Sequence, residues 1–494
     1  MYSIGFDIGS SSIKAALVEQ SSGKVISVVK QPETEMKINS IKNGWAEQDP
    51  ILWWEYICKV TKELISSTKV DVEEIKTIGI AYQMHGLVIV DKELKPLRDA
   101  IIWCDSRAVE IGNKAFLQLG EGHCKNHLFN SPANFTASKL RWVKENEPKI
   151  FEKIYKFMLP GDFIALMFSG KIQTTPSGLS EGILWDFKNK TKATSLLNNY
   201  GIPDSYLPEI VSTFSDQASV NKHGAIQSGL AVGTKITYRA GDQPNNALAL
   251  NVLNPGQVAA TGGTSGVVYG VAKGDFVKEM TRINTFAHVT YTEQNPLLGK
   301  LLNINGAGIQ YSWLKKTLGI SSYNKMNQMS ETIPVGSEEL LVFPFGNGSE
   351  RIFENKILNT HFKNIKLNIH SSAHMCRATL EGIAFSFNYG IEILKNDGIE
   401  IKVLRVGNDN LFRSQVFTET LATLINAPIE RYNTTGAVGA ARASSVTEKT
   451  ISKLSKIISS QDFVDSISSN KDREPCQEAY NNWKNNLENL IKNQ

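Results

Sequence analysis

The sequence lacks the cysteine and histidine patterns of disulfide-stabilised and zinc-binding proteins. No C-x-x-C pair and no H-E-x-x-H spacing occurs, and the number of cysteines is odd. The five thiols are scattered along the chain: Cys58, Cys104, Cys124, Cys376 and Cys476. Such a set argues against a disulfide framework and against a structural zinc site.

Long apolar runs and strong charge are also missing. No segment approaches the roughly 18 consecutive apolar residues that a membrane-spanning helix needs. The first residues lead straight into a strand-like pattern rather than a signal peptide, so we expect a cytoplasmic protein with no membrane partner. The net charge is only +4 over 494 residues, whereas a dedicated nucleic-acid binder carries a concentrated basic face.

Three common nucleotide-binding signatures are absent as well. The chain contains no G-x-x-x-x-G-K-[ST], no H-R-D or D-F-G set, and no G-x-G-x-x-G after a strand. These absences exclude a P-loop enzyme, a protein kinase and a dinucleotide-binding Rossmann domain.

What the sequence does contain is one pattern used twice. Residues 4–8, 13–18 and 24–29 read as three short strands joined by turns, which predicts an antiparallel meander. The same strand, glycine-rich turn and strand return at residues 258–270, after a turn at Asn254-Pro255-Gly256. Because the chain is too long for one core, we predict an α/β protein with domains at 1–250 and 255–445 and a helical polar tail at 446–494.

Both glycine-rich turns have the composition of a phosphate cradle. Asp7-Ile8-Gly9-Ser10-Ser11-Ser12 and Thr261-Gly262-Gly263-Thr264-Ser265-Gly266 leave main-chain N–H groups free to face a phosphate. Either turn alone fits an ordinary hairpin loop. Two such turns, each at the head of its own domain, predict a cleft that holds a polyphosphate from both sides.

Two further segments carry polar groups next to predicted strands. Asp242, in Ala240-Gly241-Asp242-Gln243, suits either a general base for an alcohol or the N-cap of the following helix. His85, between two apolar strands, suits either a sugar hydroxyl or a buried bond to a carbonyl. Trp103 fits an apolar wall or the core, and Asp105 with Arg107 fits a surface ion pair without a role.

Taken in order, these segments resemble the FGGY carbohydrate kinases, and among them the xylulokinases. The resemblance runs from residue 2 to about 445 and rests on an ordered set of motifs. The set comprises Gly5-Phe6-Asp7-Ile8-Gly9, Gly44-Trp45-Ala46-Glu47-Gln48-Asp49-Pro50 with Trp53-Trp54, Gln83-Met84-His85-Gly86, Trp103-Cys104-Asp105-Ser106-Arg107, Gly241-Asp242 and Gly263-Thr264-Ser265-Gly266.

The resemblance implies a fold of two ribonuclease H-like (actin-like ATPase) domains facing each other across a cleft. It implies phosphorylation of D-xylulose by ATP, with Asp242 as the general base and Asp7 holding Mg²⁺ through water. It implies sugar contacts by Met84, His85, Gln243 and Trp103. The nucleotide contacts that it implies are Ser11, Ser12, Gly263, Thr264, Gly306, Gln310, Gly407 and Asn410. A homodimer is common among such relatives.

The chain departs from the family pattern on the adenine side, where the common Gly-Gly-Gly-Ala is Gly407-Asn408-Asp409-Asn410. Gln243 also stands where the family commonly has Asn. Two alternatives therefore stay open: a kinase for another ketose, polyol or sugar acid such as ribulose or gluconate, and a non-catalytic actin-like nucleotide-binding module.

Overall fold

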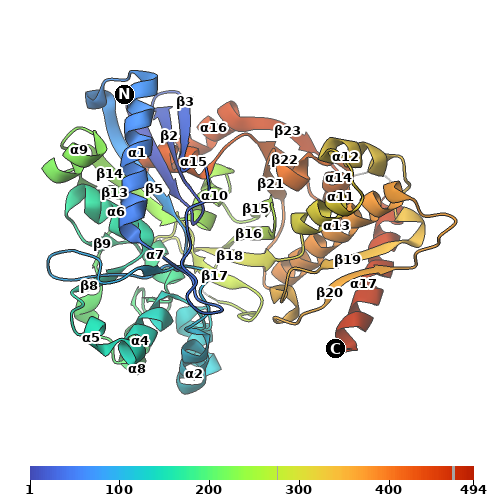
Figure 1. The fold of residues 1–494 in the computed structure, drawn as a ribbon, viewed down its shortest axis with the longest axis horizontal. Helices are drawn as coiled ribbons and strands as arrows, with labels where there is room; N and C mark the ends of the chain where they lie inside the picture. The colour runs from blue at the N-terminus through green and yellow to red at the C-terminus, as the bar shows by residue number, and fades with distance from the viewer. Residues whose placement is uncertain (275, 470–472, 494) are drawn as a thin grey trace.

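Two β-sheets organise the chain. The computed structural model describes residues 1–274, 276–469 and 473–493, and Figure 1 shows the two sheets in separate lobes. The first sheet has the order β13 (Phe214–Ser219), β14 (Lys235–Gly241), β5 (Ile75–Tyr82), β1 (Tyr2–Ile8), β2 (Ile13–Glu19) and β3 (Val25–Gln31). The second has the order β17 (Asn284–Ala287), β18 (Leu297–Ile304), β16 (Gly266–Lys273), β15 (Gln257–Gly262), β21 (Val403–Gly407), β22 (Ile429–Tyr432) and β23 (Phe463–Ile467).

The two sheets share one plan. Strands β1, β2 and β3 form an antiparallel meander, while β5 runs parallel to β1 and β14 parallel to β5. In the second sheet, β15, β16 and β18 form the meander, β21 runs parallel to β15 and β22 parallel to β21. This repetition confirms the predicted internal echo and the predicted α/β fold.

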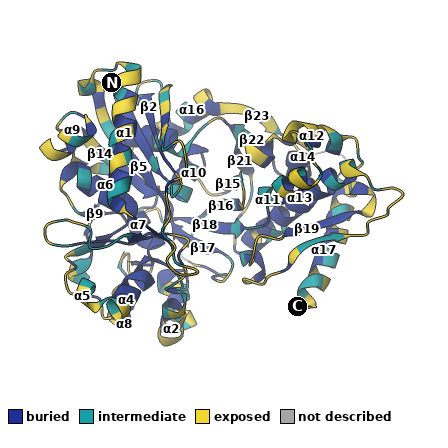
Figure 2. Cartoon of the chain, viewed as in Figure 1, coloured by how far each residue is buried: buried dark blue, intermediate teal, exposed yellow. Residues whose placement is uncertain are grey.

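Local sequence signals place the helices that cover these sheets. Helix α1 (Pro50–Thr68) begins as predicted, with the Asp49 carboxylate accepting a hydrogen bond from the Ile51 N–H at 2.8 Å. In the second lobe, α13 (Ser372–Asn396) and α14 (Gln415–Ile425) follow the helical periodicity, and the Ser414 hydroxyl caps α14. Figure 2 shows buried strands between helices whose outer faces are exposed.

Helix α15 (Gly436–Ser444) comes late in the chain and yet packs on the first sheet, against β1 and β5. Two glycines allow this approach. A Cβ on Gly5 would lie 2.1 Å from the carbonyl oxygen of Ala437, and one on Gly79 would lie 2.0 Å from that of Ala440. Because these contacts are with main-chain atoms, any larger residue would force the helix away from the sheet.

The tail differs from its prediction in one segment. Helices α16 (Ile451–Asp462) and α17 (Glu474–Lys492) are present, but Phe463–Ile467 form strand β23 instead of helix. This segment pairs antiparallel with β22, and the Arg431 guanidinium forms an ion pair with Asp465. The free edge of the second sheet supplies main-chain partners that the tail sequence alone does not reveal.

Among the described residues, no helix combines the length and the apolar character that crossing a bilayer requires.

Candidate active site

Asp242 lies where β14 ends and helix α10 (Asp242–Ala249) begins. Gly241 takes the N-cap position and, as a glycine, offers no side-chain cap, so Asp242 is the first residue of the helix. The alternative interpretation of Asp242 as the N-cap is therefore wrong, because β14 ends at Gly241 and residue 242 is already helical, whereas an N-cap residue is not. Helix α10 contacts both β15 and β16 of the second lobe, so Asp242 stands at the junction of the lobes.

The environment of Asp242 favours its protonated form more than water does. Burial, followed by the nearby charge of Asp7, raises the pKa of Asp242 from its ordinary value of 3.8 to about 7. Hydrogen bonds from the main chain and the side chain of Gln243 act in the opposite direction. A half-buried carboxyl group with a pKa near neutrality is suited to accept a proton from an alcohol.

Asp7 lies at the end of β1, opposite Lys14 of β2. Burial raises the pKa of Asp7, and the charge of Lys14 partly offsets this effect. The carboxylate lies directly against the start of α15, where a Cβ on Gly436 would be 2.6 Å from Asp7 Oδ2. The Gly436 carbonyl in turn accepts a hydrogen bond from Asn245 of α10 at 2.9 Å. Helices α10 and α15 and strand β1 thus converge on this carboxylate.

The first glycine-rich turn closes through a hydrogen bond from the Gly9 N–H to the carbonyl of Ser12 at 3.1 Å. Ser11 is exposed and Ser12 is buried. Trp103 does not belong to the core, because its side chain is 52% exposed. Its indole N–H donates a hydrogen bond to Ser10 Oγ at 3.4 Å. Trp103 therefore lies beside the turn that is expected to face the phosphates.

The second glycine-rich turn is fixed by the start of helix α11 (Gly308–Thr317). The Gly308 and Ile309 N–H groups donate to the carbonyls of Gly263 and Thr264, each at 3.0 Å. A Cβ on Gly308 would lie 2.3 Å from the Gly263 carbonyl oxygen, so only glycine allows this contact. The turn is thereby held in one shape by main-chain bonds.

A cavity of about 590 Å³ opens beside this turn. Gly263, Thr264 and Asn410 line it, as expected of nucleotide contacts. Asn410 has φ +48°, a left-handed conformation that asparagine tolerates better than most residues other than glycine. The other lining residues, which sequence reasoning missed, include Tyr311, Tyr323, Asn324, Asn327 and Arg413. The two tyrosine rings stack with centroids 5.8 Å apart.

Five residues expected to contact the nucleotide do not line this cavity: Ser11 and Ser12 of the first glycine-rich turn, and Gly306, Gln310 and Gly407. Gly306 is buried, and a Cβ there would lie 1.9 Å from the Pro344 carbonyl oxygen. Gln310 is buried and its side-chain oxygen accepts a hydrogen bond from the Thr360 hydroxyl at 2.7 Å. Gly407 ends β21 next to the Asp409 carboxylate.

The turn that follows β5 carries the expected sugar contacts. Met84 is buried and packs against Gly241, where a Cβ would lie 2.6 Å from Met84 Cγ. His85 has φ +62°, and its Nδ1 lies 2.8 Å from the carbonyl oxygen of Glu181, which ends helix α7 (Pro176–Glu181). A bond from His85 to a buried carbonyl is the alternative to a sugar contact that the sequence analysis left open, and Nδ1 makes it. Because a carbonyl only accepts, Nδ1 carries the hydrogen and Nε2 keeps a lone pair.

Several surrounding groups keep the His85 ring neutral. Burial, followed by the charge of Lys139, lowers the pKa of His85 to about 3, and Arg351 of the second lobe acts in the same direction. The ring packs edge-on against Phe135 with centroids 4.8 Å apart, and Phe286 of β17 lies 5.4 Å away. His85 therefore presents a hydrogen-bond acceptor at the contact between the lobes.

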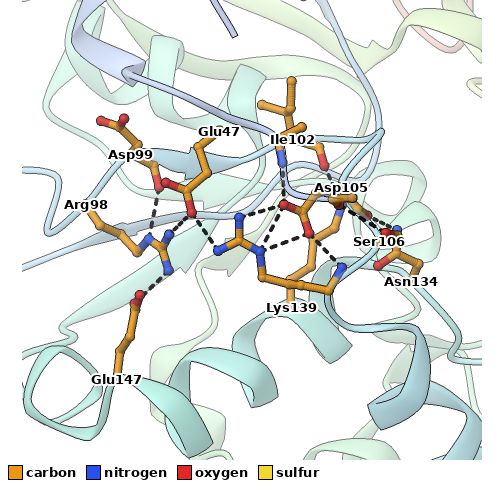
Figure 3. Close-up of polar contacts among 12 residues, drawn as sticks. Glu47, Arg98, Asp99, Ile102, Asp105, Ser106, Asn134, Lys139 and Glu147 are labelled. Carbon is orange, nitrogen blue, oxygen red and sulfur yellow. Dashed lines mark hydrogen bonds and ion pairs between the residues drawn. The ribbon is translucent and has the colours of Figure 1, made fainter. Parts of the chain in front are cut away.

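The prediction of a surface ion pair between Asp105 and Arg107 is wrong. Both side chains are fully buried, and the guanidinium binds Asp105 through two nitrogens and Glu47 through a third, at 2.6 Å. Figure 3 shows these groups in a continuous network that extends through Glu47 to Arg98. The guanidinium also stacks on Trp45 at 3.8 Å from the ring centre. Segments distant in the sequence cover the pair and exclude water.

Two buried titratable residues near the sugar side were missed from the sequence. Burial raises the pKa of Glu181 well above 4.5, which favours its protonated form beside Gly241. Lys139, in helix α4 (Thr136–Asn146), has a fully buried side chain. The burial of Lys139 could have been predicted from the sequence. Lys139 follows Thr136 by three residues and precedes Val143 by four, which places all three on the same buried face of the helix.

Comparison with known proteins gives consistent matches over nearly the whole chain. Residues 2–249 match the model for the N-terminal domain of the FGGY family of carbohydrate kinases, and residues 258–448 match that for its C-terminal domain. The chain is 29% identical over 405 residues to a xylulose kinase of Bacillus subtilis (strain 168), covering 80% of this chain and 78% of that protein.

Two solved structures share the fold. A xylulose kinase from Rhodospirillum rubrum superposes with a TM-score of 0.87 at 22% identity, covering 99% of both chains. A Plasmodium falciparum glycerol kinase with ADP gives a TM-score of 0.88 at 21% identity, covering 99% of this chain and 98% of that one.

Proposed function

The chain belongs to the FGGY family of carbohydrate kinases, and from this premise we propose that it transfers the γ-phosphoryl group of ATP to O5 of D-xylulose. The products are D-xylulose 5-phosphate and ADP. The observation that carries the proposal is the half-buried Asp242, whose pKa burial and the Asp7 charge raise to about 7 at the junction of the lobes. The curated xylulose kinases at 26–29% identity support the choice of sugar.

In the proposed reaction, Asp242 accepts the proton of the sugar hydroxyl as O5 attacks the γ-phosphorus. The new O–P bond forms while the bond between the γ-phosphorus and the oxygen of ADP breaks. Gln243 holds the Asp242 carboxylate by two hydrogen bonds, while Met84 and neutral His85 contact the sugar. The N–H groups of the two glycine-rich turns, with Thr264, bind the phosphates, and Asn410 lies on the nucleotide side.

Asp7 fits a water-mediated Mg²⁺ site. No described residue donates a hydrogen bond to its carboxylate, and the described residues contain no cluster of three side chains that would hold a metal by themselves. Magnesium typically keeps several waters and binds through one or two carboxylates plus substrate phosphates. When bound, the ion would neutralise charge on the phosphates, with Asp7 orienting its water shell.

A coupled assay of ADP release across a sugar panel tests the proposed function. D-Xylulose, L-xylulose, D-ribulose, gluconate and glycerol are compared at equal concentrations, and ³¹P NMR locates the phosphate on the product. We expect the highest kcat/KM with D-xylulose and phosphate on C5. A clear preference for ribulose or gluconate would reassign the substrate, and ATP consumption that no sugar stimulates would indicate a non-catalytic module.

We also propose a homodimer in the cytoplasm, which the family resemblance supports. Light scattering after size-exclusion chromatography measures the mass of the particle directly.

A further inference from the structure

Lys139 joins the two segments that carry the expected sugar contacts. Its ammonium group donates hydrogen bonds to the main-chain carbonyls of His85 at 2.8 Å and of Ile102 at 2.9 Å. His85 belongs to the turn after β5, and Ile102 directly precedes Trp103. One side chain from α4 therefore fixes the backbone of both segments that carry expected sugar contacts.

Burying the Lys139 ammonium group costs free energy, so we expect its contacts to have a specific role. Burial lowers the pKa of Lys139 to about 7, and the Asp105 charge offsets this effect only in part. Asp105 is itself held by Arg107 and by the main-chain N–H of Ala46, and Figure 3 shows Lys139 next to this group. An apolar side chain would fill the same space without desolvating a charge. The two carbonyl bonds are what lysine adds.

The conformation of His85 explains why such bonds are needed. His85 has φ +62°, which is uncommon for a residue other than glycine. Its ring is held by the Glu181 carbonyl, and its own carbonyl is held by Lys139. The positive charge of Lys139 also disfavours an imidazolium ion at His85. Lys139 thus holds the backbone that carries the ring and, after burial, contributes to keeping the ring neutral.

We propose that Lys139 is a positioning residue for the sugar: it holds the His85 and Ile102 backbone so that neutral His85 accepts a hydrogen bond from a sugar hydroxyl and Trp103 borders the pocket. The inference rests on the proposed function, because it assigns a partner to a sugar contact. Lys139 itself is fully buried and does not line the cavity beside the second glycine-rich turn.

The test compares Lys139→Met, Lys139→Arg and a control on the same helix, Lys144→Met. Lys144 also donates to two main-chain carbonyls, those of Tyr200 at 3.3 Å and Gly201 at 2.5 Å, but on a segment without expected sugar contacts. We expect K139M to raise the KM for D-xylulose by about 10- to 100-fold, because small misplacements of positioning groups have effects of this size. The KM for ATP should stay within about twofold.

Arginine keeps the charge and the donors, so K139R should recover most of the sugar affinity, and K144M should leave both KM values unchanged. A second readout follows the ¹⁵N shifts of the His85 imidazole, with His85→Asn to assign the signal. In K139M the ring should become protonated at higher pH than in the unaltered enzyme. A role limited to stability would not move this titration.

A folded K139M with an unchanged KM for the sugar, or with equal losses for sugar and ATP, would overturn the inference. If K139M does not fold, K139Q replaces it. The glutamine amide is uncharged and one bond shorter, which weakens both carbonyl bonds, so the same selective rise in the KM for the sugar is expected. Failure of the proposed function is seen separately in the unaltered enzyme, which would then either prefer another sugar of the panel or show no sugar-stimulated ADP release.

Discussion

Replacing Gly436 by alanine should impair catalysis without destabilising the protein. An added Cβ would lie 2.6 Å from Asp7 Oδ2 and 2.8 Å from Asp7 Cγ. To restore an ordinary contact of 3.4 Å, the carboxylate has to move by about 0.8 Å. The displaced atoms belong to a side chain and not to the backbone, so the fold can accommodate the change.

The size of both effects follows from this geometry. Misplacing a catalytic group by about 1 Å costs up to ~10²-fold in rate, equivalent to about 2.7 kcal/mol in the barrier. Gly436 is the first residue of α15 and is not in the left-handed region. Alanine there should therefore leave the free energy of unfolding unchanged or raise it by at most ~1 kcal/mol.

The assay measures kcat by coupled ADP release over a range of Mg²⁺ concentrations, together with the Tm. The control is Gly122→Ala in helix α3 (Glu121–His123), where an added Cβ meets no atom within 4 Å. We expect G436A to lose activity with an unchanged Tm, and G122A to lose neither. Normal turnover in G436A would refute the view that Asp7 must be held in this position.

Three further predictions concern charge. Because only ionised Asp242 accepts a proton, kcat/KM should fall on the acid side with a midpoint near pH 7, where burial and the Asp7 charge place its pKa; a midpoint near pH 4 would contradict this. Because the pKa of Asp242 is higher in the folded protein, the free energy of unfolding falls as the pH rises from 3.8 to about 7. Asp242→Asn cannot ionise, so it should have a higher Tm than the unaltered enzyme at pH 8 and an equal one below pH 4. Arg107→Met leaves the buried Asp105 carboxylate without its paired cation and Glu47 with Arg98 alone. It should lower the free energy of unfolding by about 3–5 kcal/mol in urea titrations, whereas unchanged stability would show that the network is dispensable.

Local signals in the sequence were sufficient to predict the frame of the fold. The alternation of Ile4, Phe6 and Ile8 gives β1, and the Asp49-Pro50 pair starts α1 where predicted. The recurrence of strand, glycine turn and strand revealed that both lobes share one sheet plan. These features depend on neighbours within a few residues, which the sequence displays directly.

Features set by contacts between distant segments were missed. Asp105 and Arg107 are two residues apart and look like a surface pair, but Trp45 and Glu47 cover them in the folded chain. Strand β23 forms because the edge of β22 is free, and nothing in the tail itself requires it. The roles of Lys139 and Glu181 likewise depend on carbonyls and carboxylates brought together only by the fold.

The most direct test of the account is the turnover of Asp242→Ala with saturating ATP and D-xylulose. If Asp242 accepts the proton of the sugar hydroxyl, kcat should fall by about 10²- to 10⁴-fold, while the KM for the sugar changes much less. A variant that turns over at nearly the normal rate would contradict the assignment of Asp242 as the general base.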